Sequence, residues 1–199
     1  MDEGAGPFGA NEHGQETMTR KLKPKVRWPD LHTSPETWSN AELRGVAINP
    51  VATGIGRHPR SISDEDWVLG CERDIEDNGL AQFLTDLLHV MRLTVPKYLG
   101  ESQPVGEYPE RRTEGDVPLP NVSYQGDRDW NKDGWNKEMV GGILCNPVLA
   151  GIPPFKAAVD EQAWIAAGVR MVGEVGLRQY LVNVLYQLKK SISGVSSEE

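Results

Sequence analysis

Residues 46–55, Val-Ala-Ile-Asn-Pro-Val-Ala-Thr-Gly-Ile, return 97 positions later as residues 143–152, Ile-Leu-Cys-Asn-Pro-Val-Leu-Ala-Gly-Ile. The match extends on both sides. Residues 38–92 align with residues 135–189 without a gap, and 14 of the 55 aligned positions are identical. Two unrelated sequences of ordinary composition would share about three identities over that length. The sequence therefore predicts a tandem duplication of one small module.

Each copy has the hydrophobic pattern of a helical hairpin. In the first copy, Ser63 and the acidic run behind it are typical of a helix start, and apolar residues then recur at helical spacing. Gly79 interrupts this pattern, which continues afterwards as a wide apolar stripe. In the second copy, Asp160 takes the capping position and Gly176 takes the break. We therefore expect a mainly α fold with a two-helix hairpin in each copy.

A shorter helix is expected in front of each hairpin. Ser34-Pro35-Glu36-Thr37 is typical of a helix start, which predicts a helix from Trp38 in the first copy. Asn49-Pro50 should end this helix, because the residue before a proline is disfavoured in the α conformation. A short strand formed by residues 46–48 or by Val51 is an alternative for this region.

The alignment and the local composition divide the chain into five parts. We expect a disordered tail at 1–19, the first copy at 20–95, a Pro- and Gly-rich linker at 96–118, the second copy at 119–192 and a polar tail at 193–199. Modules of this size bury little apolar area alone, so the two copies should share a core. The candidate core residues are Trp67, Leu84, Leu88, Trp164, Leu181 and Leu185.

The composition indicates a soluble protein of the cytoplasm without a membrane partner. Charged residues make up 25% of the chain, its two cysteines do not make a disulfide framework, and neither a signal peptide nor a long apolar run is visible. The formal net charge of −8 disfavours a general nucleic-acid binder, although residues 20–60 carry a local excess of cations. The candidate phosphate-contacting residues are Lys21, Lys23, Lys25, Arg27, Arg44, Arg57 and Arg60.

Catalytic and cofactor motifs are scarce in the sequence, so we expect a protein that is not an enzyme. The segment Asp129-Trp-Asn131-Lys-Asp133-Gly matches the first half of a calcium-binding EF-hand loop. The twelfth loop position, which should hold an acid, is Val140. Two interpretations stay open for Asp129, Asn131 and Asp133: an Asx-rich turn that caps the next helix, or a Ca²⁺ site.

Residues 38–67 and 135–164 resemble part of the recombinase DNA-binding domain of large serine recombinases. In that family a helix ends in Asn-Pro-x-Tyr-x-Gly, and a Val-Asp-Glu segment opens the next helix. The tyrosine position holds Ala52 and Leu149 here, and the chain has no catalytic serine domain. The resemblance implies a DNA-contacting ancestry without recombinase activity.

These observations favour a non-enzymatic interaction or adaptor protein that presents two homologous helical modules to a protein partner or to a second copy of itself. The alternative is a nucleic-acid-binding protein that uses the basic arm at 20–27 together with Arg44, Arg57 and Arg60.

Overall fold

The computed structural model describes residues 21–99, 121–122 and 136–193. Within these ranges the chain is mainly helical and contains no strand, which confirms the expectation of a mainly α fold. The elements are η3 (Pro35–Thr37), α1 (Asn40–Ala47), η4 (Pro50–Thr53), α2 (Asp64–Asn78), α3 (Leu80–Thr94), η5 (Val95–Tyr98), α5 (Lys137–Cys145), η6 (Pro147–Ala150), α6 (Glu161–Val175) and α7 (Leu177–Ser193), where η marks a 3-10 helix.

The predicted tail at 1–19, the linker from residue 100 onward and the final residues 194–199 lie outside the described residues. The short part of the expected linker that is described is residues 96–99, and η5 includes all of it except Leu99. Trp135, the partner of Trp38 in the sequence alignment, also lies outside them.

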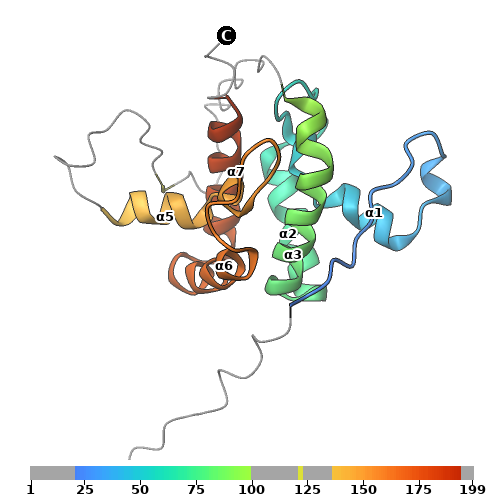
Figure 1. Ribbon diagram of the computed structural model, residues 1–199. Helices are drawn as coiled ribbons and strands as arrows, with labels where there is room; N and C mark the ends of the chain where they lie inside the picture. The colour runs from blue at the N-terminus through green and yellow to red at the C-terminus, as the bar shows by residue number, and fades with distance from the viewer. Residues whose placement is uncertain (1–20, 100–120, 123–135, 194–199) are drawn as a thin grey trace, which may run out of the picture.

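Four long helices form the centre of the molecule (Figure 1). Within each half the hairpin helices pack together, α2 on α3 and α6 on α7. Between the halves, α2 packs on α7 and α3 packs on α6. The short helices α1 and α5 flank this centre on opposite sides, where α1 contacts α2 and α3 and α5 contacts α6 and α7.

Both hairpins begin and turn at the predicted residues. The Ser63 side chain accepts a hydrogen bond from the amide of Asp66, and the Asp160 carboxylate accepts from the amides of Gln162 and Ala163. Gly79 and Gly176 separate the paired helices with φ values of 81° and 85°. Because L-residues with a side chain rarely adopt this region, glycine lets each hairpin turn within one residue.

The expected start of the short helix is wrong for the first half. Ser34 and its neighbours form only the 3-10 turn η3, and α1 begins at Asn40. Ser39 caps α1, since its side chain accepts from the amide of Glu42 while the Glu42 carboxylate accepts from the amide of Ser39. This reciprocal capping box satisfies two backbone amides that have no partner within the helix. Ser34, by contrast, makes no side-chain cap.

The strand alternative for residues 46–51 is also wrong. Val46 lies in α1 and Val51 lies in η4, on either side of Asn49. The side chain of Asn49 accepts from the amide of Val51 at 3.2 Å, and Asn146 repeats this contact with Val148 at 3.1 Å. The Asn-Pro pair therefore ends one helix and starts a 3-10 turn.

One hydrophobic core contains residues from both halves. The indole Nε1 of Trp67 donates to the carbonyl of Ile48 at 3.0 Å. The six candidate core residues lie in it with at most 2% of their surface exposed: Trp67, Leu84, Leu88, Trp164, Leu181 and Leu185.

A size exchange distinguishes the two hairpins. Phe83 and Tyr180 occupy matched positions and are both fully buried. A Cβ atom placed on Gly168 would lie 2.4 Å from the hydroxyl oxygen of Tyr180, and the residue that matches Gly168 in the first half is Cys71. The larger aromatic residue thus faces the smaller partner in the second half.

None of the helices in the described part of the chain is both long enough and apolar enough to cross a membrane.

Candidate functional site

Lys189 in α7 ties the second half to the first. Its ammonium pairs with the Asp64 carboxylate at 2.8 Å and donates to the carbonyl of Thr53 at 3.2 Å. Only 8% of Lys189 is exposed. Burial lowers the pKa of Lys189, and the nearby Asp64 carboxylate opposes that shift.

Arg92 in α3 makes the reverse connection. Its guanidinium pairs with Glu161 at 2.6 Å and donates to the carbonyls of Ala150 and Gly151 at 2.7 and 3.0 Å. Arg92, Glu161 and Ala150 are each separated by 97 positions from their counterparts in the Lys189 contact, which are Lys189, Asp64 and Thr53. We call the two contacts together the reciprocal clasp.

A third ion pair crosses between the halves without such a counterpart. Arg178 in α7 binds the Glu72 carboxylate of α2 with two hydrogen bonds of 3.0 and 2.7 Å. Arg178 aligns with Ala81 and Glu72 aligns with Val169, and these two residues cannot form an ion pair.

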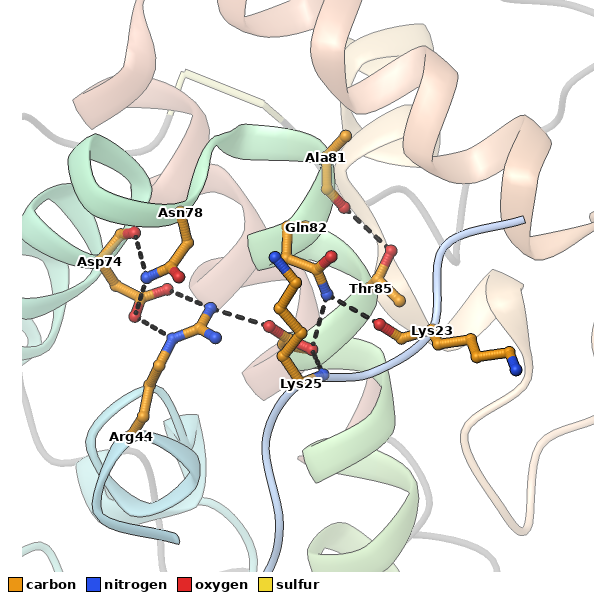
Figure 2. Close-up of polar contacts among 9 residues, drawn as sticks. Lys23, Lys25, Arg44, Asp74, Asn78, Ala81, Gln82 and Thr85 are labelled. Atoms are coloured by element: carbon orange, nitrogen blue, oxygen red, sulfur yellow. Dashed lines mark hydrogen bonds and ion pairs between the residues drawn. The ribbon is translucent and has the colours of Figure 1, made fainter. Parts of the chain in front are cut away.

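A buried ionic network holds the basic arm against the first hairpin (Figure 2). Its centre is Asp86 in α3, whose side chain is fully buried. The Asp86 carboxylate accepts from the backbone amide of Lys25 at 2.6 Å and from Gln82 at 3.1 Å. Gln82 also donates to the carbonyl of Lys23 at 2.9 Å. Two hydrogen bonds therefore fix the arm by its backbone and leave the lysine side chains exposed.

Arg44 in α1 supplies the cation of this network. Its guanidinium forms a bidentate pair with Asp74 in α2 and also pairs with Asp86 at 2.8 Å. The hydrogen bond with Asp74 raises the pKa of Arg44, with the carboxylate charges acting in the same direction and burial opposing them. Asn78 donates to Asp74 at 3.3 Å. One arginine thus joins α1, α2 and α3.

The second half holds residues 121–122 in a similar way, with neutral groups. Asn183 matches Asp86 and accepts from the amide of Asn121 at 3.1 Å and from Gln179 at 3.1 Å. It also donates to the side-chain oxygen of Asn121 at 2.8 Å. Gly141 and Met171 stand where the first half has Arg44 and Asp74, so no ion pair forms at that position.

The seven candidate phosphate-contacting cations do not meet at one place. Lys21, Lys23, Lys25 and Arg27 are exposed on the arm, whereas Arg44 points into the network. Arg57 is exposed, and its amide donates to the carbonyl of Tyr98 at 2.8 Å, beyond the end of α3. Arg60 is exposed and pairs with Asp64 at 3.4 Å.

A pocket of about 350 Å³ opens beside the arm at the boundary between the halves. It places two exposed lysines of the arm near the clasp residues Arg92 and Glu161. The lining residues are Lys21, Leu22, Lys23, Pro24, Thr85, His89, Arg92 and Glu161. The basic surface of the arm therefore reaches the second half.

The two cysteines are free, buried and chemically protected. Burial raises the pKa of Cys145 to about 12 and raises that of Cys71 well above its usual range. Because the thiolate is the reactive form, both residues are inert near neutral pH. The described residues contain no group of three or more His, Cys, Asp or Glu side chains that could hold a metal ion. Asp129, Asn131 and Asp133 lie outside the described part of the chain.

No model of a known protein family matches the chain, and neither a curated protein nor a solved structure matches it. The site must therefore be interpreted from its own chemistry.

Sequence reasoning missed the clasp and the role of Asp86. A signal for the clasp was present, since Arg92 aligns with Lys189 and Asp64 aligns with Glu161, so that both charges are kept. The signal for Asp86 is the polar pair Gln82 and Asp86 inside an apolar stripe, which recurs as Gln179 and Asn183.

Proposed function

We propose that the chain is a tandem duplication of a helical module and works as a non-enzymatic interaction protein. The shared order of helices and 3-10 turns supports the duplication, as does the reciprocal clasp. The clasp fixes the orientation of the two halves relative to each other, so a partner that contacts both halves always binds the same combined surface. The protection of both thiols supports a binding role over nucleophilic chemistry.

The exposed apolar residues of the flanking helices carry this proposal. Leu43 in α1 is 45% exposed, and Val140, which matches it in α5, is 41% exposed. Leu31 adds an exposed apolar side chain on the α1 side, in the segment that leads to that helix. Single exposed apolar residues are common on protein surfaces. Their recurrence at matched positions of two outward helices favours a contact surface used on both sides.

The test combines the capture of binding partners with two charge substitutions. Partners are captured from nuclease-treated native lysate with wild-type protein, with Leu43→Glu plus Val140→Glu, and with the control Ala163→Glu. Ala163 is exposed on α6, so the control places one glutamate on another part of the surface. We expect the double variant to lose the captured partner and the control to keep it. Sedimentation of the three purified proteins measures their oligomeric state and so shows whether the partner is a second copy of the chain.

Equal capture by the double variant and the control would remove the proposal. A reproducible turnover by the purified protein would remove its non-enzymatic part.

A second proposal is contact with nucleic acid through the arm. Four exposed cations lie within seven residues, Lys21 to Arg27, and their backbone is fixed by Asp86 and Gln82. A rigid row of cations suits a phosphate backbone. The resemblance to the recombinase DNA-binding domain also supports contact with nucleic acid. Arg44 is already neutralised, which leaves the arm, Arg57 and Arg60 for such contacts.

A gel-shift assay at about 50 mM salt tests this second proposal, because phosphate contacts weaken steeply as salt rises. The arm variant carries glutamine at Lys21, Lys23, Lys25 and Arg27. The control carries glutamine at four other exposed cations, Lys97, Lys156, Arg170 and Lys190. Binding that disappears in the arm variant alone supports the proposal, whereas absence of a shift with wild-type protein refutes it.

A further inference from the structure

The boundary between the two halves is formed by one hairpin from each half. Because α2 packs on α7 and α3 packs on α6, each hairpin contributes both of its helices. The charged side chains of the reciprocal clasp also come from these hairpins, with Asp64 and Arg92 on the first and Glu161 and Lys189 on the second. Each half therefore presents a surface that is sufficient for pairing with a hairpin of the same type.

The clasp has the symmetry of a contact between two equal partners. Asp64 binds the cation that aligns with Arg92, and Arg92 binds the acid that aligns with Asp64. In a two-fold dimer the same reciprocity holds, because residue i of one subunit contacts residue j of the other and residue j contacts residue i. The boundary inside this chain thus has the form of a dimer interface.

Arg178 restricts this boundary to halves of different kinds. It pairs with Glu72 across the boundary at 2.7 Å, and the residues that align with this pair, Ala81 and Val169, are uncharged. Two first halves would place Glu72 opposite alanine, and two second halves would place Arg178 opposite valine. Only a first half and a second half together form the ion pair.

Gly168 adds a restriction of shape. A Cβ atom at this position would lie 2.9 Å from a terminal methyl carbon of Leu84, across the boundary. Two first halves would bring Cys71 to the same place, because Cys71 aligns with Gly168. Leu84 would then have to move from its fully buried position. Charge and shape therefore both favour the pairing of a first half with a second half.

The covalent connection is long enough for the second half of another copy to be used. Residues 100–120 separate Leu99 from Asn121, which is hydrogen-bonded to Asn183 of α7. A stretch of this length can extend over about 70 Å. A domain of about 150 residues has a radius of gyration of only about 15 Å. A neighbouring copy is therefore within reach of either half.

We propose that the first half of one copy binds the second half of another, so that two chains form a closed dimer by exchanging halves. The inference rests on the proposed duplication. It goes beyond the proposed contact surface of α1 and α5, because the exchange uses the hairpins. Each boundary of this dimer keeps the contacts of the single chain. The covalent connection favours pairing within one copy in dilute solution, so the dimer should increase with chain concentration.

Two full-length variants with opposite charge reversals test the exchange. Asp64→Lys places two ammonium groups at one clasp contact, and Lys189→Asp places two carboxylates there, so that neither variant pairs its own halves well. A dimer with one copy of each variant has opposite charges at both boundaries. The two variants, one of them ¹⁵N-labelled, are unfolded together in denaturant and refolded. Native mass spectrometry then identifies the mixed dimer by its mass.

We expect the mixture to give at least about tenfold more mixed dimer than the dimer that either variant forms alone, because two like-charge contacts are replaced by two ion pairs. Wild-type protein refolded at rising chain concentration should give a rising fraction of dimer. This fraction should be readily detectable at about 1 mM, the order of the effective concentration that a connection between two modules provides.

Two further mixtures serve as controls. Glu65→Lys and Lys190→Asp make the same charge changes at the neighbouring exposed positions, so their mixture should give no more dimer than wild-type protein. The mixture of Asp64→Lys with Arg92→Asp restores opposite charges only between two first halves. It should therefore stay at the level of the first control.

The partly exposed ion pair provides a second test that does not depend on the buried clasp. Glu72→Arg and Arg178→Glu create like charges within one copy and opposite charges between two copies, and these side chains are 20% and 40% exposed. Their mixture should also give more mixed dimer than the exposed control. This result is expected even where the clasp variants fail to refold.

Three outcomes overturn the proposal: no excess of mixed dimer in either complementary mixture, an equal excess in the mixture that favours two first halves, or no dimer of the wild-type chain at about 1 mM. The exchange should persist in the variant Leu43→Glu plus Val140→Glu. Failure of the exchange and failure of the proposed contact surface are therefore distinguishable.

Discussion

Asp86 carries a negative charge in a fully buried position and is stabilised by contacts from three separate segments of the chain. A buried charge of this kind is tolerated only when it is paired and hydrogen-bonded. Arg44 provides the pairing and is itself shared with Asp74. The second half has Asn183 at the matching position, and this neutral side chain is hydrogen-bonded without needing a counter-charge.

This contrast predicts strong coupling between Arg44 and Asp86. Arg44→Ala should cost about 3–5 kcal/mol, because it leaves two carboxylates without their cation. Asp86→Asn added to it should restore at least about 1 kcal/mol, since it removes one of those charges. Chemical denaturation of the two single variants and the double variant measures the coupling, with Arg73→Ala as an exposed control on α2. Additive costs would contradict the proposed network.

The buried thiols predict a loss of stability at alkaline pH. The pKa of Cys145 rises from its usual 9.0 to about 12 in the folded chain. A group with a raised folded pKa contributes stability that is present below the unfolded value, so this contribution should disappear as pH rises from 9 towards 12. The Cys71 and Tyr180 pKa values are raised in the same direction.

Denaturant unfolding between about pH 9 and pH 11, in the presence of a reductant, checks this prediction. Cys145→Ala should lose stability more slowly than wild type, by up to about 1.4 kcal/mol per pH unit. Parallel stability curves would show that the Cys145 thiol does not titrate as described.

At the scale of elements, much of the helical pattern could be predicted from the sequence because local signals and packing agree. Ser63, Asp160 and the two hinge glycines are short-range features, and each acts where the sequence predicts. The start of α1 could not be predicted in this way, because two candidate caps compete within six residues. Ser39 prevails over Ser34 because Glu42 completes its capping box.

The candidate site was less predictable because its contacts join residues that are distant in sequence. Arg44 meets partners 30 and 42 positions away, and Lys189 meets Asp64 across 125 positions. Local periodicity carries no information about such pairs. An excess of cations at 20–60 predicted a basic face, but it could not separate the exposed Lys25 from the neutralised Arg44.

The Asn-Pro turns make an element-scale prediction. Asn49→Ala and Asn146→Ala should each cost about 1 kcal/mol, because each removes a side-chain cap from a 3-10 turn. Asn40→Ala, at an exposed position of α1, should change stability by less than about 0.5 kcal/mol. Thermal or chemical unfolding of the three variants gives the comparison, and a neutral Asn146→Ala would contradict the equivalence of the turns.

At the scale of the whole molecule, the two halves should unfold together. Their helices cross-pack, their core is common, and the reciprocal clasp closes the boundary from both sides. A half that separated would leave Lys189 and Arg92 without their carboxylates and would expose the buried faces of four helices. Cooperative unfolding is the consequence of that shared interior.

Two tryptophan substitutions test this cooperativity. Trp67→Ala and Trp164→Ala should each cost about 3–5 kcal/mol, because both side chains lie in the core. Each variant should unfold in one transition that includes the other half. Hydrogen exchange followed on peptides from α3 and α7 provides the measurement. Protection lost in only one half would show that the halves are independent domains.

The close approach of Gly168 and Tyr180 limits how far the two hairpins can be made alike, because the aligned residues of the first half are the buried Cys71 and Phe83. A designer who rebuilt this chain from two identical halves could not transfer one residue at a time, because cysteine at position 168 would collide with Tyr180 and glycine at position 71 would leave a void. The residues at both positions of a hairpin have to be exchanged together. Symmetrised versions of the protein should accordingly be made by exchanging whole hairpins.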